Sequence, residues 1–325
     1  MLTHFQLKRL VPGIEKIVNK TKLNLSGLTI ITECATGIYA CTPIIALLAG
    51  AKQVVCFGND SHYRAFSSAK EDVIKLAQAM SFQQRNLIIT DREEVLTDYL
   101  RKADIVANSG HMRPLDKKKL MNLKQNTVIP LMYESWEFRK TDIDLAYCKE
   151  KSILVAGTNE RHPDINIFNY LGPLIAKVLL NSSMEIIENK YLIVCDNDFT
   201  EYIAKSLLSL GAEVYYYPDR NYTELDGIIF AHTPSKCGGK LEIDYGIFPE
   251  DVSICIHVWG DVNRSLFDNV AWYPEPEQQE GYMGISLSEI GIETVVRLQA
   301  GGLKVAELLL RNETDYGNVE LAQLL

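Results

Sequence analysis

The chain has 325 residues, of which 47% are hydrophobic and 23% charged, with a formal net charge of -9. This length and balance predict a globular protein with two hydrophobic cores. The acidic balance argues against nucleic acid as a main partner, because phosphate binding requires clustered lysine and arginine. The sequence contains neither an apolar run long enough to span a bilayer nor a signal-peptide pattern at its start.

The cysteine pattern indicates free thiols. The seven cysteines include no C-x-x-C pair and no spacing with histidine typical of zinc. Cys56, Cys195 and Cys255 lie inside apolar runs, where cysteine behaves as a small core residue. We therefore expect a soluble, cytoplasmic protein that holds no metal ion.

The first half alternates apolar runs with helical patterns after an amphipathic helix in residues 1–18. Such alternation predicts an α/β fold with a doubly wound parallel sheet. Strands are expected at residues 28–32, 53–57, 86–89, 105–107, 127–131 and 153–155. Helices are expected at residues 42–48, 67–80, 93–102, 116–123 and 142–149.

The second half restarts the same rhythm after a long apolar-faced helix at residues 166–181. Strands are expected at residues 191–195, 213–217, 227–231 and 253–258, and helices at residues 199–210 and 288–310. We therefore expect an N-terminal Rossmann-like domain (1–165), a connecting helix (166–185) and a C-terminal Rossmann-like domain with a returning helix (186–325).

Ligands bind beyond the carboxyl ends of parallel strands, so the polar residues that follow each strand of the first domain are candidates for a substrate site. The turn at Gly37 either presents backbone N–H groups to an anion or is a plain connection. Asp60 either binds a ribose or caps the next helix. The candidates for the substrate site are Glu33, Thr36, Gly37, Asp60, Asn108, His111, Arg113, Glu134, Asn159, Glu160 and His162.

The turn after the first strand of the second domain stands where a dinucleotide fingerprint belongs. Cys195, Asn197 and Thr200 occupy its three glycine positions. Side chains there hinder the approach of a pyrophosphate, and neighbouring acids add negative charge. This turn either binds a dinucleotide in an altered way or no longer binds one. The candidates for cofactor binding are Cys195, Asp196, Asn197, Asp198, Phe199, Thr200, Asp219, Arg220 and His232.

A histidine with a carboxylate in the same loop can supply acid–base catalysis. His257 ends a predicted strand, and Asp261 and Arg264 follow it. These three residues are the candidates for a catalytic group, although a histidine at a strand end is also commonly structural.

The order of these elements resembles the formate/glycerate dehydrogenase-like architecture, which includes the 2-hydroxyacid dehydrogenases and is similar in plan to S-adenosylhomocysteine hydrolases. The resemblance covers most of the chain and carries over only the position of the turn at residues 195–200. It implies NAD or NADP in the second domain, a substrate in the cleft between the domains, and a homodimer.

Three functional hypotheses follow. The first is a small-metabolite enzyme of the NAD(P)-dependent dehydrogenase type with altered or weakened dinucleotide binding. The second is a non-redox small-molecule-binding or partner subunit of a biosynthetic pathway. The third is a protein whose N-terminal domain binds adenosine or an S-adenosyl ligand.

Overall fold

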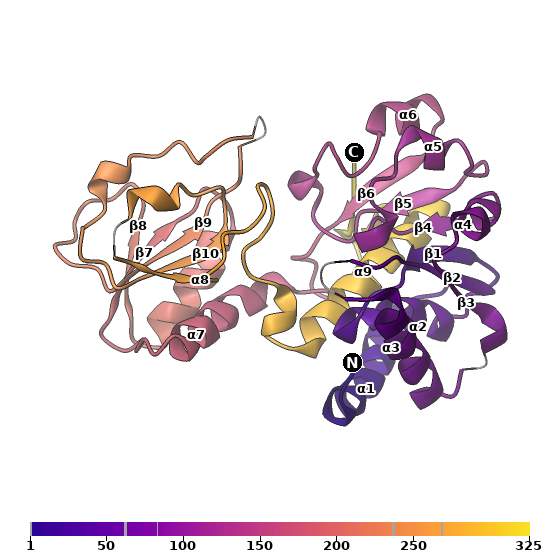
Figure 1. Cartoon of the computed structure of the whole chain (residues 1–325), viewed down its shortest axis with the longest axis horizontal. Coiled ribbons are helices and arrows are strands. Elements are labelled where there is room, and N and C mark those ends of the chain that lie inside the picture. The colour runs from indigo at the N-terminus through magenta and orange to yellow at the C-terminus, as the bar shows by residue number, and fades with distance from the viewer. Residues whose placement is uncertain (1, 62–63, 83, 236–237, 268) are drawn as a thin grey trace. The chain divides into compact units, whose positions relative to one another are not determined.

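The computed structural model describes residues 2–61, 64–82, 84–235, 238–267 and 269–325 (Figure 1). The chain forms two compact units: unit 1 is Met1–Ile167 with Ile292–Leu325, and unit 2 is Phe168–Gly291. The helix expected as a connection therefore lies in unit 2, and the C-terminal segment expected in the second domain lies in unit 1.

Unit 1 is built on a seven-stranded sheet in the order β14-β6-β5-β4-β1-β2-β3. The first six strands in sequence are parallel, and β14 pairs antiparallel with β6 at the edge. The strands are β1 (Thr29–Glu33), β2 (Gln53–Phe57), β3 (Leu87–Thr90), β4 (Ile105–Val106), β5 (Val128–Pro130), β6 (Leu154–Thr158) and β14 (Ala322–Leu324). This confirms the predicted doubly wound parallel sheet, to which the structure adds β14.

Helices connect the parallel strands and bury their apolar residues, as the near-continuous apolar runs of the strands predict. The helices of unit 1 are α1 (His4–Thr21), α2 (Cys41–Leu48), α3 (Phe66–Ala79), α4 (Glu93–Leu100), α5 (Lys117–Leu120), α6 (Leu145–Glu150) and α9 (Ile292–Leu310). One hydrophobic core contains Ile31, Val55, Val106 and Ile129, one from each of the central strands.

Helix α9 belongs to unit 1 because it packs against α1, α2, β5 and β6. In Figure 1 it is the yellow helix beside this sheet. Gly302 permits the close approach, since a Cβ atom there would lie 2.3 Å from the sulfur of Met132. The sequence predicted this helix, but its partners are long-range contacts that no local pattern reveals.

Unit 2 is built on a five-stranded parallel sheet in the order β11-β10-β9-β7-β8. Its strands are β7 (Lys190–Val194), β8 (Glu213–Tyr216), β9 (Gly227–Ala231), β10 (Ile254–Trp259) and β11 (Ala271–Tyr273), and its helices are α7 (Leu171–Asn181) and α8 (Phe199–Ser209). Four of these strands were predicted and β11 was not. The two parallel sheets confirm the predicted fold class.

No helix in the described part of the chain is both long and apolar enough to cross a membrane.

Candidate functional site

The sheet order of unit 1 places a topological switch point between β1 and β4, where ligands bind in open α/β sheets. The loops that follow β4, β5 and β6 meet at the same edge, because these strands are parallel neighbours. The candidate residues in these three loops therefore follow neighbouring strands at one edge of the sheet.

Glu33 ends β1 and lies against the loop after β4. Gly110 makes room for it, since a Cβ atom there would lie 1.5 Å from the Glu33 carboxylate oxygen Oε2. Burial raises the pKa of Glu33, whereas the Arg113 guanidinium and the backbone N–H of His111 act to lower it. Four predicted residues, Glu33, Asn108, His111 and Arg113, thus come together at the switch point.

Two arginines and a tyrosine share one buried carboxylate, Asp142. The Tyr133 hydroxyl donates a 2.7 Å hydrogen bond to Asp142 Oδ2, and Nη2 of Arg139 lies 2.9 Å from the same oxygen. Nε of Arg113 lies 3.5 Å from it. The guanidinium carbons of Arg113 and Arg139 lie 5.2 and 5.4 Å from the centre of the Tyr133 ring. We call Arg113 and Arg139 the arginine pair. Tyr133 and Asp142 support it.

Asn108 connects this group to the loop after β4. Its side-chain nitrogen donates to the Tyr133 hydroxyl at 3.0 Å, and its backbone oxygen accepts from Arg113 Nη2 at 2.8 Å. Both arginine side chains remain about one quarter exposed, whereas Asp142 is buried. The arginine side chains are therefore accessible to a ligand, while the carboxylate of Asp142 that balances their charge is buried.

Three glutamates, which we call the carboxyl trio, follow β5 and β6: Glu134, Glu137 and Glu160. Glu134 is buried and accepts from the backbone N–H of Glu160 at 2.8 Å and from Gln323 Nε2 at 2.6 Å. Burial raises the pKa of Glu134 despite these hydrogen bonds. Gln323 comes from β14, so the C-terminal strand also supports the site.

Glu137 is the member of the trio whose pKa both arginines, Arg113 and Arg139, act on. Burial and the Glu134 carboxylate raise its pKa to about 7, while Arg139 and Arg113 act to lower it. Burial, Glu137 and Glu134 raise the pKa of Glu160 well above its ordinary value. The carboxyl groups of the trio therefore hold their protons to a higher pH than an ordinary glutamate, because burial and the neighbouring like charges oppose ionisation.

Other predicted residues of unit 1 have local structural partners. Asp60 accepts a hydrogen bond from the backbone N–H of Phe66 at the start of α3. This contact agrees with the prediction that Asp60 caps the next helix. The N–H of Gly37 donates to Asp72 at 2.8 Å, so a side chain already occupies it. Thr36 precedes a short 3-10 helix and makes no cap hydrogen bond with it.

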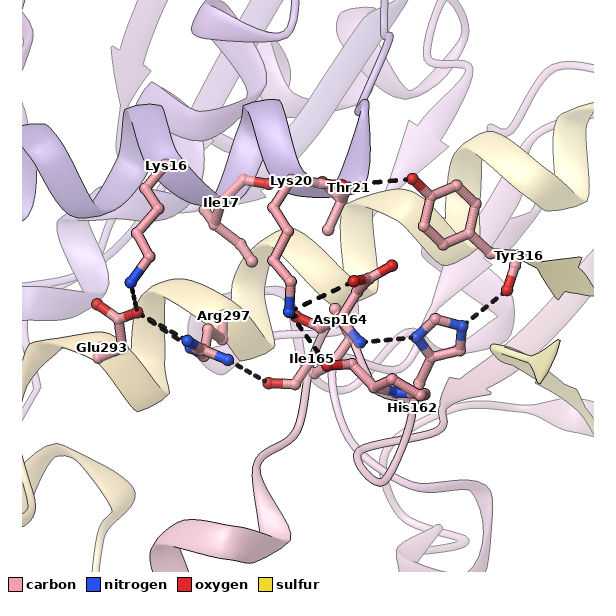
Figure 2. Close-up of polar contacts among 11 residues, drawn as sticks. Lys16, Ile17, Lys20, Thr21, His162, Asp164, Ile165, Glu293, Arg297 and Tyr316 are labelled. Carbon is pink, nitrogen blue, oxygen red and sulfur yellow. Dashed lines mark hydrogen bonds and ion pairs between the residues drawn. The ribbon is translucent and has the colours of Figure 1, made fainter. Parts of the chain in front are cut away.

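Asn159 and His162 form hydrogen bonds with the C-terminal segment. Asn159 Nδ2 donates to the backbone oxygen of Glu320 at 2.7 Å. Figure 2 shows His162 with Nε2 2.8 Å from the backbone oxygen of Tyr316 and Nδ1 accepting from the N–H of Asp164. Both ring nitrogens are thus engaged in closing unit 1.

In unit 2, the turn between β7 and α8 is closed by its own side chains. Asn197 Oδ1 accepts from the N–H of Phe199, and Asn197 Nδ2 donates to the backbone oxygen of Ala231 at 3.1 Å. Asp196 Oδ1 accepts from the N–H of Thr233 at 2.8 Å and lies 3.6 Å from His232 Nδ1.

The remaining cofactor candidates lie in the same unit with separate roles. Cys195 donates to the Ala231 backbone oxygen at 3.1 Å, and burial raises its pKa. Asp198 and Phe199 begin α8, with Thr200 in its first turn. Exposed Arg220 pairs with Asp244, and Asp219 accepts from a nearby backbone N–H.

His257 is buried with both ring nitrogens engaged. Nε2 contacts the backbone oxygen of Gly260, and Nδ1 lies 3.1 Å from Arg264 Nη2. Burial lowers the pKa of His257 to about 4, so the ring is neutral at physiological pH. Asp261 instead binds the N–H of Gly281 at 2.8 Å. This geometry gives His257 a structural role in the segment, and its predicted role in catalysis stays untested.

No set of three or more metal-binding side chains in the described parts of the chain is arranged to hold a metal ion.

The site contains residues that the sequence did not single out. Tyr133, Glu137, Arg139 and Asp142 were not among the candidates. The available signal was the charge density of the ten residues after β5, which bring two acids and an arginine directly behind a buried strand.

Comparison with known proteins supports the fold. No protein-family model matches the chain. No curated protein matches its sequence. Among solved structures, a dipicolinate synthase subunit from Bacillus halodurans aligns with a TM-score of 0.55 and 12% identity, covering 88% of this chain and 99% of that one. The corresponding dipicolinate synthase chain from Bacillus subtilis gives a TM-score of 0.54 and 10% identity, covering 90% and 99%.

An NAD+-bound 3-phosphoglycerate dehydrogenase from Entamoeba histolytica aligns less well, with a TM-score of 0.48 and 11% identity over 91% of this chain and 100% of that one. At such identities the likeness establishes the fold alone. The chain has the two-Rossmann architecture of these dipicolinate synthase chains, and the architecture predicted from the sequence is confirmed.

Proposed function

We propose that this protein binds a small polar metabolite at the carboxyl edge of the unit 1 sheet and transfers a proton to or from it through Glu137. The observation that carries the proposal is a half-buried carboxyl group with a pKa of about 7 beside two arginines. A group with this pKa both accepts and releases protons near neutral pH, as a general acid or base must.

The arginine pair supplies the other requirement, which is recognition of negative charge. Guanidinium groups bind carboxylates through paired N–H donors, and they stabilise negative charge that develops when a proton leaves carbon. Tyr133 and Asp142 contact both guanidiniums, and the positive charge of both acts on Glu137. In this proposal Arg113 and Arg139 orient an anionic group of the metabolite and Glu137 moves the proton.

The dehydrogenase hypothesis additionally requires NAD or NADP in unit 2. The turn after β7 fits a dinucleotide poorly, because Asp196 and Asn197 already bind the backbone N–H groups of Thr233 and Phe199. A carboxylate at this position also repels a pyrophosphate. We therefore propose that dinucleotide binding is weakened, and we assign no hydride transfer to this chain.

A second candidate is the non-redox binding or partner subunit. The self-closed turn of unit 2 favours it, because the same arginine pair and carboxyl trio would bind a metabolite without turnover. The adenosine hypothesis for unit 1 gains nothing from the structure of its turn, where Asp72 takes the Gly37 N–H and Asp60 caps α3. The predicted homodimer and the predicted substrate site between the domains stay predictions.

Deuterium wash-in tests the proposal directly. The purified full chain is incubated in D2O with a panel of 2-oxo acids, 2-hydroxy acids and amino acids, and loss of C–H signals is followed by proton NMR. We expect exchange in at least one compound without added NAD, and a fall of about 100-fold or more in Glu137→Gln. The control is Glu150→Gln, an exposed glutamate of unit 1.

Exchange that survives in Glu137→Gln would contradict the assigned role. Exchange that appears only with added NAD would favour the dehydrogenase hypothesis, and binding without any exchange would favour the non-redox subunit.

A further inference from the structure

Gln323 lies on the C-terminal strand β14, and its side chain reaches the loop that follows β5. Its amide oxygen Oε1 accepts from the backbone N–H of Ser135 at 2.9 Å, and its amide nitrogen Nε2 donates to Glu134 Oε2 at 2.6 Å. The orientation of the amide follows from these partners, because a backbone N–H can only donate. Both polar atoms of one side chain are thus used on two consecutive residues of the loop.

Gly157 of β6 allows this contact. Gln323 pairs with Gly157 in the sheet, and β6 lies between β14 and β5. A Cβ atom at Gly157 would lie 2.3 Å from the backbone nitrogen of Ser135 and 2.9 Å from the backbone carbonyl carbon of Glu134. The loop after β5 therefore rests directly on the backbone of β6, which brings the Ser135 N–H within reach of a side chain on the next strand.

The loop that Gln323 holds also carries Glu137. Glu134 precedes a short 3-10 turn at Ser135–Glu137, in which the N–H of Glu137 donates to the backbone oxygen of Glu134 at 3.2 Å. Oε1 of Glu134 accepts from the N–H of Glu160 at 2.8 Å, so β14 and the loops after β5 and β6 meet at this carboxyl group. Since Glu137 is the last residue of the turn, its position depends on the contacts made where the turn begins.

The backbone of the C-terminal segment is secured separately, along β6 and the loop after it. β14 pairs antiparallel with β6, and the N–H of Leu325 donates to the backbone oxygen of Val155 at 3.1 Å. Asn159 Nδ2 donates to the backbone oxygen of Glu320. These contacts use main-chain atoms of the C-terminal segment, so the side chain at position 323 can be changed while the strand keeps them.

We propose that Gln323 is a positioning residue for Glu137 and that it couples the C-terminal strand to the site. Its amide holds Ser135 and Glu134, and these two residues begin the turn on which Glu137 stands. The proposal rests on the proposed function, in which Glu137 moves a proton, and it adds that the site is complete only when β14 is docked. Gln323 acts through the loop and is assigned no contact with the metabolite.

Amide hydrogen exchange followed by NMR of the full chain tests the contact without any substrate. Gln323→Met keeps the length of the side chain but removes the amide donors and acceptor. The Ser135 N–H loses its acceptor, so it should exchange with solvent about tenfold faster or more than in the wild type. The control is Leu324→Ala, a neighbour on β14 whose side chain is 57% exposed, and it should leave the exchange of Ser135 unchanged.

A second readout distinguishes positioning from a merely structural role. Burial is the largest cause of the raised pKa of Glu137, so a loosened turn that admits water should lower this pKa. In Gln323→Met the carboxyl 13C resonance of Glu137 should therefore titrate at a lower pH than in the wild type. Deuterium wash-in through Glu137 should slow by about tenfold or more. Near-ultraviolet circular dichroism checks that the variant is folded.

Unchanged exchange of the Ser135 N–H in folded Gln323→Met would overturn the proposal. Faster exchange of this N–H, with the titration of Glu137 and the wash-in both unchanged, would overturn the positioning role and leave the proposed function intact. If the wild type washes in no deuterium, the proposed function fails. The exchange of Ser135 and the titration of Glu137 then still decide whether Gln323 positions the turn.

Discussion

At the scale of single residues, Asp142 is the group on which the arginine pair depends. It is buried, accepts the Tyr133 hydroxyl and balances Arg139. Asp142→Asn keeps the shape but leaves the guanidiniums without their counter-charge. We expect a loss of about 3 kcal/mol in the free energy of unfolding, measured by urea denaturation. Asp98→Asn, an exposed control in unit 1, should change it by less than about 1 kcal/mol.

Glu137 should make stability depend on pH. Its pKa rises from 4.5 to about 7 on folding, so between these values the folded state binds more protons than the unfolded state. The stability that the protonated carboxyl confers is complete below the lower value and is lost as the pH rises through the higher one. Unfolding measured across this range should show a decline that is shallower in Glu137→Gln. Identical slopes in the two proteins would contradict the assigned pKa.

The polar residues that directly follow the predicted strands identified part of the site. Glu33, Asn108, Arg113, Glu134 and Glu160 were found because parallel strands end at one edge. Sequence could not show which side chains are buried: Asn159 and Glu160 are neighbours, yet Glu160 is buried while Asn159 binds the backbone of the C-terminal segment. His257 was selected for its chemistry, but its burial and its Arg264 partner depend on packing that spacing does not encode.

At the scale of elements, the turn between β7 and α8 decides whether unit 2 can hold a dinucleotide. The double variant Asp196→Ala with Asn197→Gly removes the carboxylate and frees the N–H groups of Thr233 and Phe199. We expect NADH affinity to rise by about tenfold or more over the wild type, measured by calorimetry. Tight NADH binding by the wild type, or none gained by the variant when the exposed control Asp251→Asn behaves as wild type, would contradict this interpretation of the turn.

Helices α7 and α8 pack closely at Gly172. A Cβ atom there would lie 2.6 Å from the backbone oxygen of Tyr202 and 2.0 Å from Ser206 Oγ. Gly172→Ala should therefore destabilise unit 2 by about 1–3 kcal/mol, because a backbone atom cannot move aside cheaply. Gly13→Ala in α1 is the matched control, since no atom lies within 4 Å of its Cβ position. Thermal unfolding should show no loss for this control.

Element order was largely predictable because apolar runs and helical periodicity are local signals. Four short strands were missed. Two of them, β11 and β14, are three residues long, and the other two, β12 (Asp315–Tyr316) and β13 (Val319–Glu320), are two residues long. The first two are strands because β11 pairs with β10 and β14 pairs with β6. These pairings form only when the chain folds. Short edge strands carry too few residues for a pattern.

At the scale of the whole molecule, the chain leaves unit 1 at Ile167 and returns to it at Ile292. Figure 2 shows how the returning helix is secured: Arg297 Nη1 donates to the backbone oxygen of Ile165, and Glu293 pairs with Lys16 of α1. The sequence predicted two Rossmann-like units and a returning C-terminal helix, but it assigned that helix to the second domain, whereas the helix belongs to unit 1. Periodicity identifies a helix, whereas its partners follow from contacts across more than a hundred residues.

The measurement that tests the central claim most directly needs no substrate. Glutamate carboxyls labelled with 13C are followed by NMR through a pH titration of the full chain. The account predicts one resonance that titrates near the neutral value expected of Glu137, and that is absent in Glu137→Gln. A spectrum in which every glutamate titrates near its ordinary pKa would contradict a proton held at this edge of unit 1, and with it the proposed function.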